Sequence, residues 1–306
     1  MNGAIRIGVS GWRYPPWRGE FYPDRLRQDQ ELTYASERLP TVEINGSFYS
    51  LQLPSSYAQW YEATPSEFVF GVKGGRFITH MKRLKDIEKP LANFFASGLF
   101  NLKEKLGPIL WQFPPNMRYD AERFENFFRI LPRDTAAALS LARRRDARMS
   151  GRAALSIDAV RPIRHAIEIR NETFLDREFI HLLRRNNVAL VIADTGERWP
   201  QPHDITADFV YLRLHGATEL YRSRYTEPEL RLWAEWLRAW SRGAQPDDGL
   251  RVVPEAVVSR VPRDVFCYFD NTDKLHAPNN ALRLMRLLDV GWKPAQTGTP
   301  RPARTR

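Results

Sequence analysis

The sequence contains a single cysteine, Cys267, among its 306 residues. One cysteine excludes a disulfide within the chain, and its place inside an expected strand favours a buried, small apolar side chain over a nucleophile. The chain also lacks any apolar run near the roughly 20 residues that a membrane span needs. Its N-terminus leads into residues 5–9 without the apolar core of a signal peptide, so we expect a cytoplasmic protein with no membrane contact.

Two signatures of common cofactor sites are also missing. The turn after the first expected strand, residues 8–11, lacks the G-x-G-x-x-G spacing, which disfavours an open doubly wound sheet that binds dinucleotides. None of the six histidines belongs to a pair with the close helical spacing of a zinc site. The sequence therefore predicts no metal site, and it identifies no cofactor.

Positive charge is in excess, because 46 Lys and Arg residues outnumber 36 Asp and Glu residues and give a net charge of +10. Much of this excess is local. A solvated basic surface is the ordinary explanation for such clusters, and nonspecific binding of nucleic acid is the alternative. The clusters are Arg143, Arg144, Arg145, Arg148 and Arg152 in one segment and Arg301, Arg304 and Arg306 at the C-terminus.

Residues 209–216 show the clearest strand pattern in the chain. Phe209, Tyr211, Arg213 and His215 alternate with aliphatic residues, which is the period of two expected of a strand. One face is aliphatic, and the other changes from aromatic to cationic toward the C-terminal end. A parallel barrel strand has this pattern when its outer face packs under helices and its inner face ends in a site.

Seven further segments have strand character. Helical patterns are expected between all of them, including residues 90–107, with a proline start and a glycine end, and residues 226–242, with a capping box of Thr226 and Glu229. Eight alternating strands and helices predict an α/β fold with a single (β/α)8 TIM-type barrel. The seven segments are residues 5–9, 41–45, 68–73, 109–113, 166–170, 189–194 and 265–271.

Two segments fall outside this alternation. Residues 132–164 form a polar connection that is too long for an ordinary loop, so we expect a basic helical insertion before the fifth strand. In a barrel this insertion starts from the N-terminal face, opposite the site. Residues 1–292 are then one TIM-type barrel domain, and residues 293–306 are expected to be a disordered tail rich in Arg and Pro.

Polar side chains gather near the C-terminal ends of the expected strands, on their inward faces. These ends converge in a barrel, and active sites of this fold lie there. Charged groups at such a place must pair with one another or meet a ligand. A ring of internal ion pairs, for example between Glu168 and Arg213, is the structural alternative to a binding site. The residues are Ser10, Glu43, Asn45, Lys73, Gln112, Glu168, Arg170, Asp194, Arg213, His215 and Asp270 or Asn271.

A series of short motifs runs in order through nearly the whole chain. The motifs are Gly8-Val9-Ser10-Gly11-Trp12 with Phe21-Tyr22-Pro23, Val42-Glu43-Ile44-Asn45 with Phe48-Tyr49, Lys73 with Thr79-His80, Leu110-Trp111-Gln112-Phe113-Pro114-Pro115, Ile167-Glu168-Ile169-Arg170, Tyr211 to Gly216, and Tyr268-Phe269-Asp270-Asn271. Together they resemble the YecE-like family, domain of unknown function 72. The resemblance implies a TIM-type barrel with these residues as a shared site, and it implies no particular reaction.

Two classes of function remain open. In the first, the C-terminal mouth of the barrel is an enzyme active site or binding site for a small anionic ligand, a sugar- or nucleotide-like molecule with phosphate or carboxylate. The candidate acid–base residues are Glu43, His80, Glu168 and His215. The candidate ligand-binding residues, which are cations, stacking aromatics and polar groups, are Trp12, Asn45, Tyr49, Lys73, Gln112, Arg170, Asp194, Arg213 and Asn271. Trp17 and Trp111 are further stacking candidates.

The second class is a nucleic-acid-binding protein or a metal-dependent phosphoesterase that uses the same cations and aromatic rings. The basic insertion and the tail would then add nonspecific contacts to nucleic acid. The sequence leaves the reaction open between a hydrolase and an isomerase. It also leaves the oligomeric state open.

Overall fold

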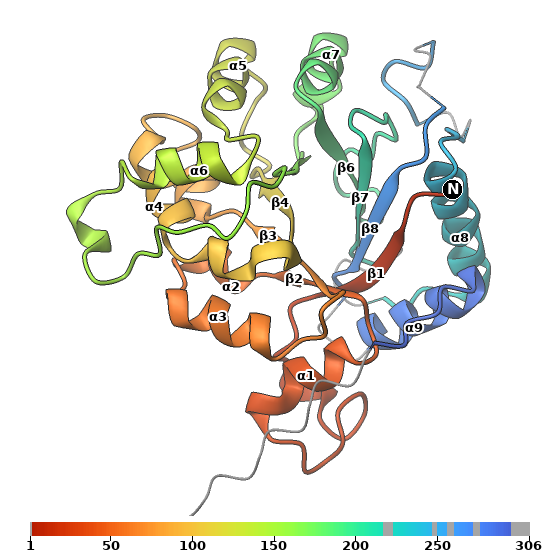
Figure 1. Ribbon diagram of the computed structural model, residues 1–306. Helices are drawn as coiled ribbons and strands as arrows, with labels where there is room; N and C mark the ends of the chain where they lie inside the picture. Colours follow the sequence, from red (N-terminus) through yellow and green to blue (C-terminus); the bar gives the residue numbers. More distant parts are fainter. Residues whose placement is uncertain (1, 217–222, 247–249, 256–259, 272–275, 295–306) are drawn as a thin grey trace, which may run out of the picture.

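The computed structural model describes residues 2–216, 223–246, 250–255, 260–271 and 276–294. Parallel strands close into a barrel in which each strand pairs with its neighbours in sequence, and β1 pairs with β8 (Figure 1). The predicted α/β TIM-type barrel is therefore confirmed. The strands are β1 (Ile5–Ser10), β2 (Thr41–Ile44), β3 (Val69–Lys73), β4 (Leu106–Gln112), β5 (His165–Glu168), β6 (Val188–Asp194), β7 (Phe209–Leu214) and β8 (Asp264–Phe269).

The helices of the described ranges lie around the outside of the barrel (Figure 1). The capping box of Thr226 and Glu229 opens α8, as predicted, and Gly243, with a φ of 83°, follows its end. The helices are α1 (Glu31–Ser36), α2 (Gly46–Tyr49), α3 (Pro54–Glu62), α4 (Glu88–Ala96), α5 (Ala121–Ile130), α6 (Thr135–Ala142), α7 (Arg177–Arg185), α8 (Glu227–Ser241) and α9 (His276–Leu288). Most of the expected tail, residues 295–306, lies outside the described residues.

The prediction of one continuous helix over residues 90–107 is wrong. The α-helix ends at Ala96, and a separate 3-10 stretch, Leu99–Lys105, follows it. The break lies at Gly98, which has a φ of 124°. A Cβ atom at this position would lie 2.6 Å from the Cα atom of Pro54 in α3. Both the backbone angle and the close approach of α3 require glycine, so the helix is interrupted here.

The connection between β6 and β7 contains no helix, although the sequence predicted helices between all strands. Residues 195–208 are all described and form turns and extended chain. Within them Asp204 is buried, and its carboxylate accepts a hydrogen bond of 2.7 Å from the backbone N–H of Val252. The neighbouring His203 ring lies 5.1 Å from the Trp236 ring of α8. An anchored extended segment therefore takes the place of a helix.

The basic insertion begins and ends at the N-terminal face of the barrel, as predicted. Its two ends lie side by side, because the Thr135 N–H donates to the Arg161 carbonyl at 2.9 Å. Beyond α6 the chain reaches the first turn of α4, where Lys89 Nζ donates to the Arg144 carbonyl at 2.8 Å. Because α4 starts at the mouth and runs away from it, the middle of the insertion lies at mouth level. The prediction concerned only where the insertion starts; its middle part packs along α4.

Side chains fill the interior of the barrel. Gly71 of β3 leaves room for two tyrosine hydroxyl groups, since a Cβ atom there would lie 2.8 Å from Tyr268 Oη and 3.1 Å from Tyr211 Oη. The Tyr211 hydroxyl donates to Glu43 at 2.6 Å. Because Gly71 has no side chain, the Tyr211 hydroxyl has room to reach the Glu43 carboxylate. The apolar interior consists of Leu110, Ala166, Ala189, Val191, Ala193, Phe209, Tyr211, Phe266 and Tyr268.

Gly71→Ala should reduce the free energy of unfolding by about 1–3 kcal/mol, because the added methyl group collides with two hydroxyl groups in a closely packed interior. Gly291→Ala is the control, because no atom lies within 4 Å of a Cβ built there. Urea unfolding of both variants and the parent measures the difference. Equal stabilities for all three proteins would contradict the packing described.

Candidate functional site

Arg213, near the C-terminal end of β7, is the centre of a buried cluster of charges at the mouth. Its side chain is fully buried. Its Nη1 atom donates to Glu168 Oε2 at 2.7 Å, and its Nη2 atom donates to Glu43 Oε1 at 2.9 Å and to Asp270 Oδ2 at 2.8 Å. These carboxylates come from β2, β5 and the residue after β8. One guanidinium group therefore joins four parts of the barrel, as a ring of ion pairs would.

The Glu43 carboxylate is occupied on both oxygen atoms. Oε1 accepts from Ser10 Oγ at 2.5 Å, and Oε2 accepts from the Tyr211 hydroxyl at 2.6 Å and from Arg213 Nε at 3.2 Å. Asn45 Nδ2 in turn donates to Ser10 Oγ at 2.8 Å. This saturation suits Glu43 to positioning Arg213, and it leaves no free lone pair directed toward a ligand proton.

Glu168 carries a second cation on its other side. Its Oε1 atom accepts from Arg170 Nε at 2.8 Å, and the Arg170 guanidinium lies 3.8 Å from the Trp199 ring centroid. His215 lies beside this pair, with Nε2 at 3.9 Å from Glu168 Oε1 and Nδ1 at 2.9 Å from Asp270 Oδ2. The structure thus brings together most of the predicted acid–base and cationic residues.

The charges in this cluster stabilise one another. Burial alone would raise the pKa of Glu168, but Arg170 and Arg213 outweigh burial and hold that pKa well below its ordinary value. Burial would likewise lower the pKa of Arg213, but Asp270 and Glu43 raise it well above its ordinary value. The paired groups therefore stay charged at neutral pH.

Lys73, the last residue of β3, differs from Arg213 in having no ion pair within the described part of the chain. Its side chain is 9% exposed, and its Nζ atom lies 4.5 Å from the Phe48 ring centroid. Ser47 Oγ fixes the strand end by donating to the Lys73 carbonyl at 2.6 Å. Burial, and then the nearby Arg213, lower the pKa of Lys73 to about 8.

His80 lies on a π-helical turn, Phe77–Met81, that follows β3. Its Nδ1 atom is 2.8 Å from Thr79 Oγ1, and its ring contacts the Phe48 ring that Lys73 also contacts, with 5.0 Å between centroids. Burial and the positive charge of Lys73 lower the pKa of His80 to about 4. The imidazole is therefore neutral at physiological pH.

Two residues near the mouth were not predicted. Arg76 is exposed on the loop after β3, with its guanidinium 5.7 Å from the ring of Tyr49, which is 66% exposed. Trp199, which stacks on Arg170, lies in the segment between β6 and β7 that has no helix. Both lie on loops, where the alternation of a strand gives no information on direction. The Gly74-Gly75 pair directly after Lys73 was the one signal for a close turn there.

Two predicted residues, Asp194 and Asn271, make their contacts outside the Arg213 cluster, and a third, Gln112, lies beside it. Asp194 shares the outward face of β6 with Ile192, and its Oδ2 accepts from the Tyr225 hydroxyl at 2.9 Å. Asn271 Nδ2 donates to Asn280 Oδ1 of α9 at 3.1 Å, which gives it a structural contact. Gln112 is 5% exposed at the end of β4 and aligns with Glu168 in the sheet.

Of the three tryptophan candidates, one lines a pocket and two are buried in the core. Trp111 and Trp17 are fully buried, so neither can stack on a ligand in this structure. Trp12 stands edge-on to Trp60, with 5.3 Å between ring centroids. These two rings line a pocket of about 260 Å³ together with Asn45, whose Oδ1 atom is buried without a hydrogen-bond partner among the described residues.

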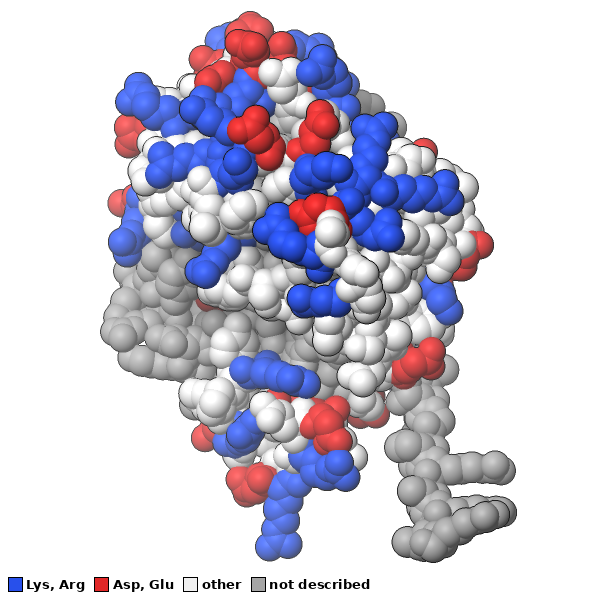
Figure 2. All heavy atoms as spheres, turned by 90° about the vertical axis from the view of Figure 1, so that its left-hand side faces the viewer, with Lys and Arg blue, Asp and Glu red and all other residues white. Residues whose placement is uncertain are grey.

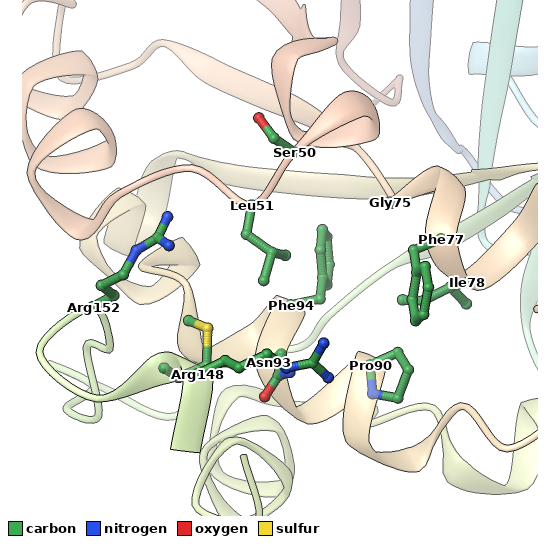
Figure 3. Close-up of a pocket in the computed structure, with 11 residues that line it drawn as sticks. Ser50, Leu51, Gly75, Phe77, Ile78, Pro90, Asn93, Phe94, Arg148 and Arg152 are labelled. Atoms are coloured by element: carbon green, nitrogen blue, oxygen red, sulfur yellow. The ribbon is translucent and has the colours of Figure 1, made fainter. Parts of the chain in front are cut away.

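A second pocket, of about 360 Å³, is lined on one side by Phe77 and Ile78 (Figure 3), which belong to the same turn as His80. Leu51, Phe77 and Phe94 give it an apolar lining, and Arg148 and Arg152 of the insertion lie at its edge (Figure 3). The insertion is fixed here because Asn93 Nδ2 donates to Asp146 Oδ2 at 3.0 Å. The basic segment thus contacts the region of the β3 loop instead of the far end of the barrel.

Within the described ranges, no three His, Cys, Asp or Glu side chains are grouped so that they could hold a metal ion. No helix in those ranges is long and apolar enough to cross a membrane. A closed α/β barrel with charged side chains at the C-terminal ends of its strands defines the class of TIM-type barrel proteins.

The chain belongs to the family described as "Protein of unknown function DUF72", whose sequence profile matches residues 6–305. The resemblance to the YecE-like family is thereby confirmed. The chain is 30% identical over 116 residues to the UPF0759 protein YunF of Bacillus subtilis (strain 168), a match that covers 36% of this chain and 40% of that protein.

Solved structures of the family share the fold. A DUF72 family protein (TM1631) of Thermotoga maritima MSB8 is 24% identical and superimposes with a TM-score of 0.68, covering 94% of this chain and 99% of that one. A DUF72 family protein (EF0366) of Enterococcus faecalis V583 is 19% identical, with a TM-score of 0.66 and coverage of 95% and 99%. At these identities the likeness shows the fold alone.

Arg213→Gln should reduce the free energy of unfolding by about 3–5 kcal/mol, because it leaves buried carboxylates without their shared cation. Arg76→Gln is the matched control, since Arg76 is exposed and has no ion pair within the described ranges. Thermal melts of both variants measure the difference. An Arg213→Gln protein that melts with the parent would show that the cluster does not hold the barrel together.

Proposed function

We propose that the mouth of the barrel binds a small anionic molecule through Lys73 and acts on it as an enzyme. The observation that carries the proposal is that Lys73 is 9% exposed and has no ion pair in the described ranges, whereas the adjacent Arg213 is paired with three carboxylates. A buried cation is unfavourable until an anion reaches it. A ligand with phosphate or carboxylate would supply that charge.

The balance of charge at the mouth supports an anion. Four cations stand against three carboxylates, so one positive charge is left over, on the side of β3 and its loop. Charged walls of one sign raise the local concentration of ligands of the opposite sign. The cations are Lys73, Arg76, Arg170 and Arg213, and the carboxylates are Glu43, Glu168 and Asp270.

The remainder of the ligand has candidate partners in the loops that follow β1 and β2. The pocket of Trp12 and Trp60 borders the cluster, because Asn45 lines it and also donates to Ser10 Oγ. An aromatic edge and the buried Asn45 Oδ1 atom, which has no hydrogen-bond partner among the described residues, suit a sugar- or nucleotide-like ring that carries hydroxyl donors. His80, which is neutral, and His215 are the candidates for moving a proton.

Nucleic-acid binding is the second candidate function, and a basic surface favours it. Figure 2 shows Lys and Arg side chains spread over the face that carries α4, α6 and the insertion. Arg143, Arg144, Arg148 and Arg152 of the insertion are exposed. Such a surface would attract a polyanion without reading its sequence.

Lys73→Gln should remove anion binding while leaving the melting temperature near that of the parent, because no carboxylate in the described ranges loses a partner. Thermal melts with and without sulfate, inorganic phosphate and sugar phosphates test this. Lys85→Gln, at an exposed position, is the control and should keep the ligand-induced rise. A parent that responds to none of these anions, or a Lys73→Gln protein that responds as the parent does, would refute the proposal.

Anion affinity should fall as the pH rises through about 8, where Lys73 loses its proton. Above that pH the affinity should drop roughly tenfold per pH unit, until the higher pKa of Lys73 in the complex is reached. Calorimetric titration with sulfate between pH 6 and pH 9.5 measures this, because sulfate keeps its charge throughout. A constant affinity across this range would mean that Lys73 does not hold the anion.

Changing Arg143, Arg144, Arg145 and Arg148 together to Ala should reduce retention of the protein on nonspecific DNA at low salt. Sulfate binding at the mouth should be unchanged, because these side chains lie outside the Arg213 cluster. Loss of sulfate binding in this variant would show that the insertion contributes to the site through the loop after β3.

A further inference from the structure

We propose that the Lys73 amine forms an imine with the carbonyl carbon of its ligand, so that the substrate class is a small anionic aldehyde or ketone. This inference rests on the proposed function, since the same mouth must first bind the anion. It narrows the ligand from any small anion to one with a reactive carbonyl group, such as a 2-oxo acid or an open-chain sugar phosphate.

A comparison with Lys105, the other lysine buried among the described residues, supports a reactive amine at position 73. Lys105 is buried as well, but its Nζ atom donates to the Tyr61 carbonyl at 2.6 Å and to the Thr64 carbonyl at 2.7 Å. Burial lowers the pKa of Lys105 too, but these two carbonyl acceptors favour its charged form. Lys73 has no such oxygen acceptor in the described ranges and faces an aromatic ring. Its amine can therefore lose a proton and present its lone pair.

The electrostatic surroundings of Lys73 also favour its neutral, reactive amine. Burial and Arg213 favour the neutral amine, whereas Glu168, Glu43 and Asp270 partly oppose them, and the resulting pKa is about 8. At pH 7.5 roughly a quarter of the Lys73 side chains would be neutral, against a far smaller fraction of an exposed lysine. A lysine with this property is suited to nucleophilic attack on a carbonyl carbon.

The chemical step balances without any oxidant or reductant. The Nζ lone pair attacks the carbonyl carbon, a C–N bond forms, and the carbonyl oxygen takes up a proton to give a carbinolamine. The C–O bond then breaks, and the oxygen leaves as water with two protons that came from the amine. The net change is amine plus carbonyl to imine plus water.

Side chains at the mouth are available both to transfer the protons of this reaction and to stabilise the charged imine that it forms. The neutral His80 ring packs on the same Phe48 ring as Lys73, so we assign it the transfer of protons between nitrogen and the leaving oxygen. A protonated imine keeps the positive charge of the lysine. Glu168 and Glu43, which already interact with the Lys73 charge, would stabilise that cation.

Reductive trapping tests the inference directly. The full-length protein is incubated with cyanoborohydride and, in separate samples, pyruvate, glyoxylate or glyceraldehyde 3-phosphate, and adducts are located by peptide mass mapping. We expect modification at Lys73 to exceed that at exposed Lys85 by at least about tenfold with one or more probes, because its neutral fraction is larger. Lys73→Arg should abolish the preferred adduct, and Lys85→Arg should leave it unchanged.

Two outcomes would overturn the inference. One is modification spread over exposed lysines with no preference for Lys73, and the other is an unaltered pattern in the Lys73→Arg protein. Sulfate titration of the same preparations separates the two proposals. If sulfate binds in a Lys73-dependent manner but no Lys73 adduct forms, the imine is refuted and the anion site stands. If neither is observed, both proposals fail.

Discussion

The charge of Arg213 is the constraint on which the rest of the mouth depends. A guanidinium group does not release its proton in proteins, so its burial requires anionic partners. Glu43, Glu168 and Asp270 supply them, and each carboxylate then holds a further group. Tyr211 is fixed by Glu43 in this way. The directions of side chains on four strands therefore follow from the need to neutralise one cation.

The same arrangement explains why Lys73, at the end of β3, has no ion pair among the described residues although Arg213 has three. Arg213 takes up the carboxylates of the mouth, and Lys73 is left beside it with an aromatic ring as its neighbour. Burial, and then the neighbouring positive charges, lower the pKa of Lys73 and the pKa of His80. The mouth thus has an ion-paired floor and, on the β3 side, a rim whose Lys73 and His80 side chains have lowered pKa values. The proposed chemistry is placed on that rim for this reason.

Strand periodicity identified the floor from the sequence, because alternation fixes which face a side chain takes. It placed Glu43 correctly on the inward face. Asp194 was assigned to the inward face because it lies at the end of β6, but it is two residues from Ile192 and therefore shares the outward face with it. Loops carry no such period, so Arg76 was missed. The break at Gly98 was missed for another reason: it is set by the approach of a distant helix, which a local pattern does not record.

The pairing of β1 with β8 has a consequence for synthesis of the chain. Ile5 of β1 lies opposite Val265 of β8, so one edge of β1 stays uncovered until the much later β8 has been made. Contacts of such long sequence separation form slowly. Until then the nascent sheet has two open edges, which invite pairing with other chains. Asp270 also emerges after Arg213, so the growing chain holds that cation with one carboxylate fewer. The described barrel therefore can neither close nor complete the Arg213 cluster until β8 and Asp270 have been made.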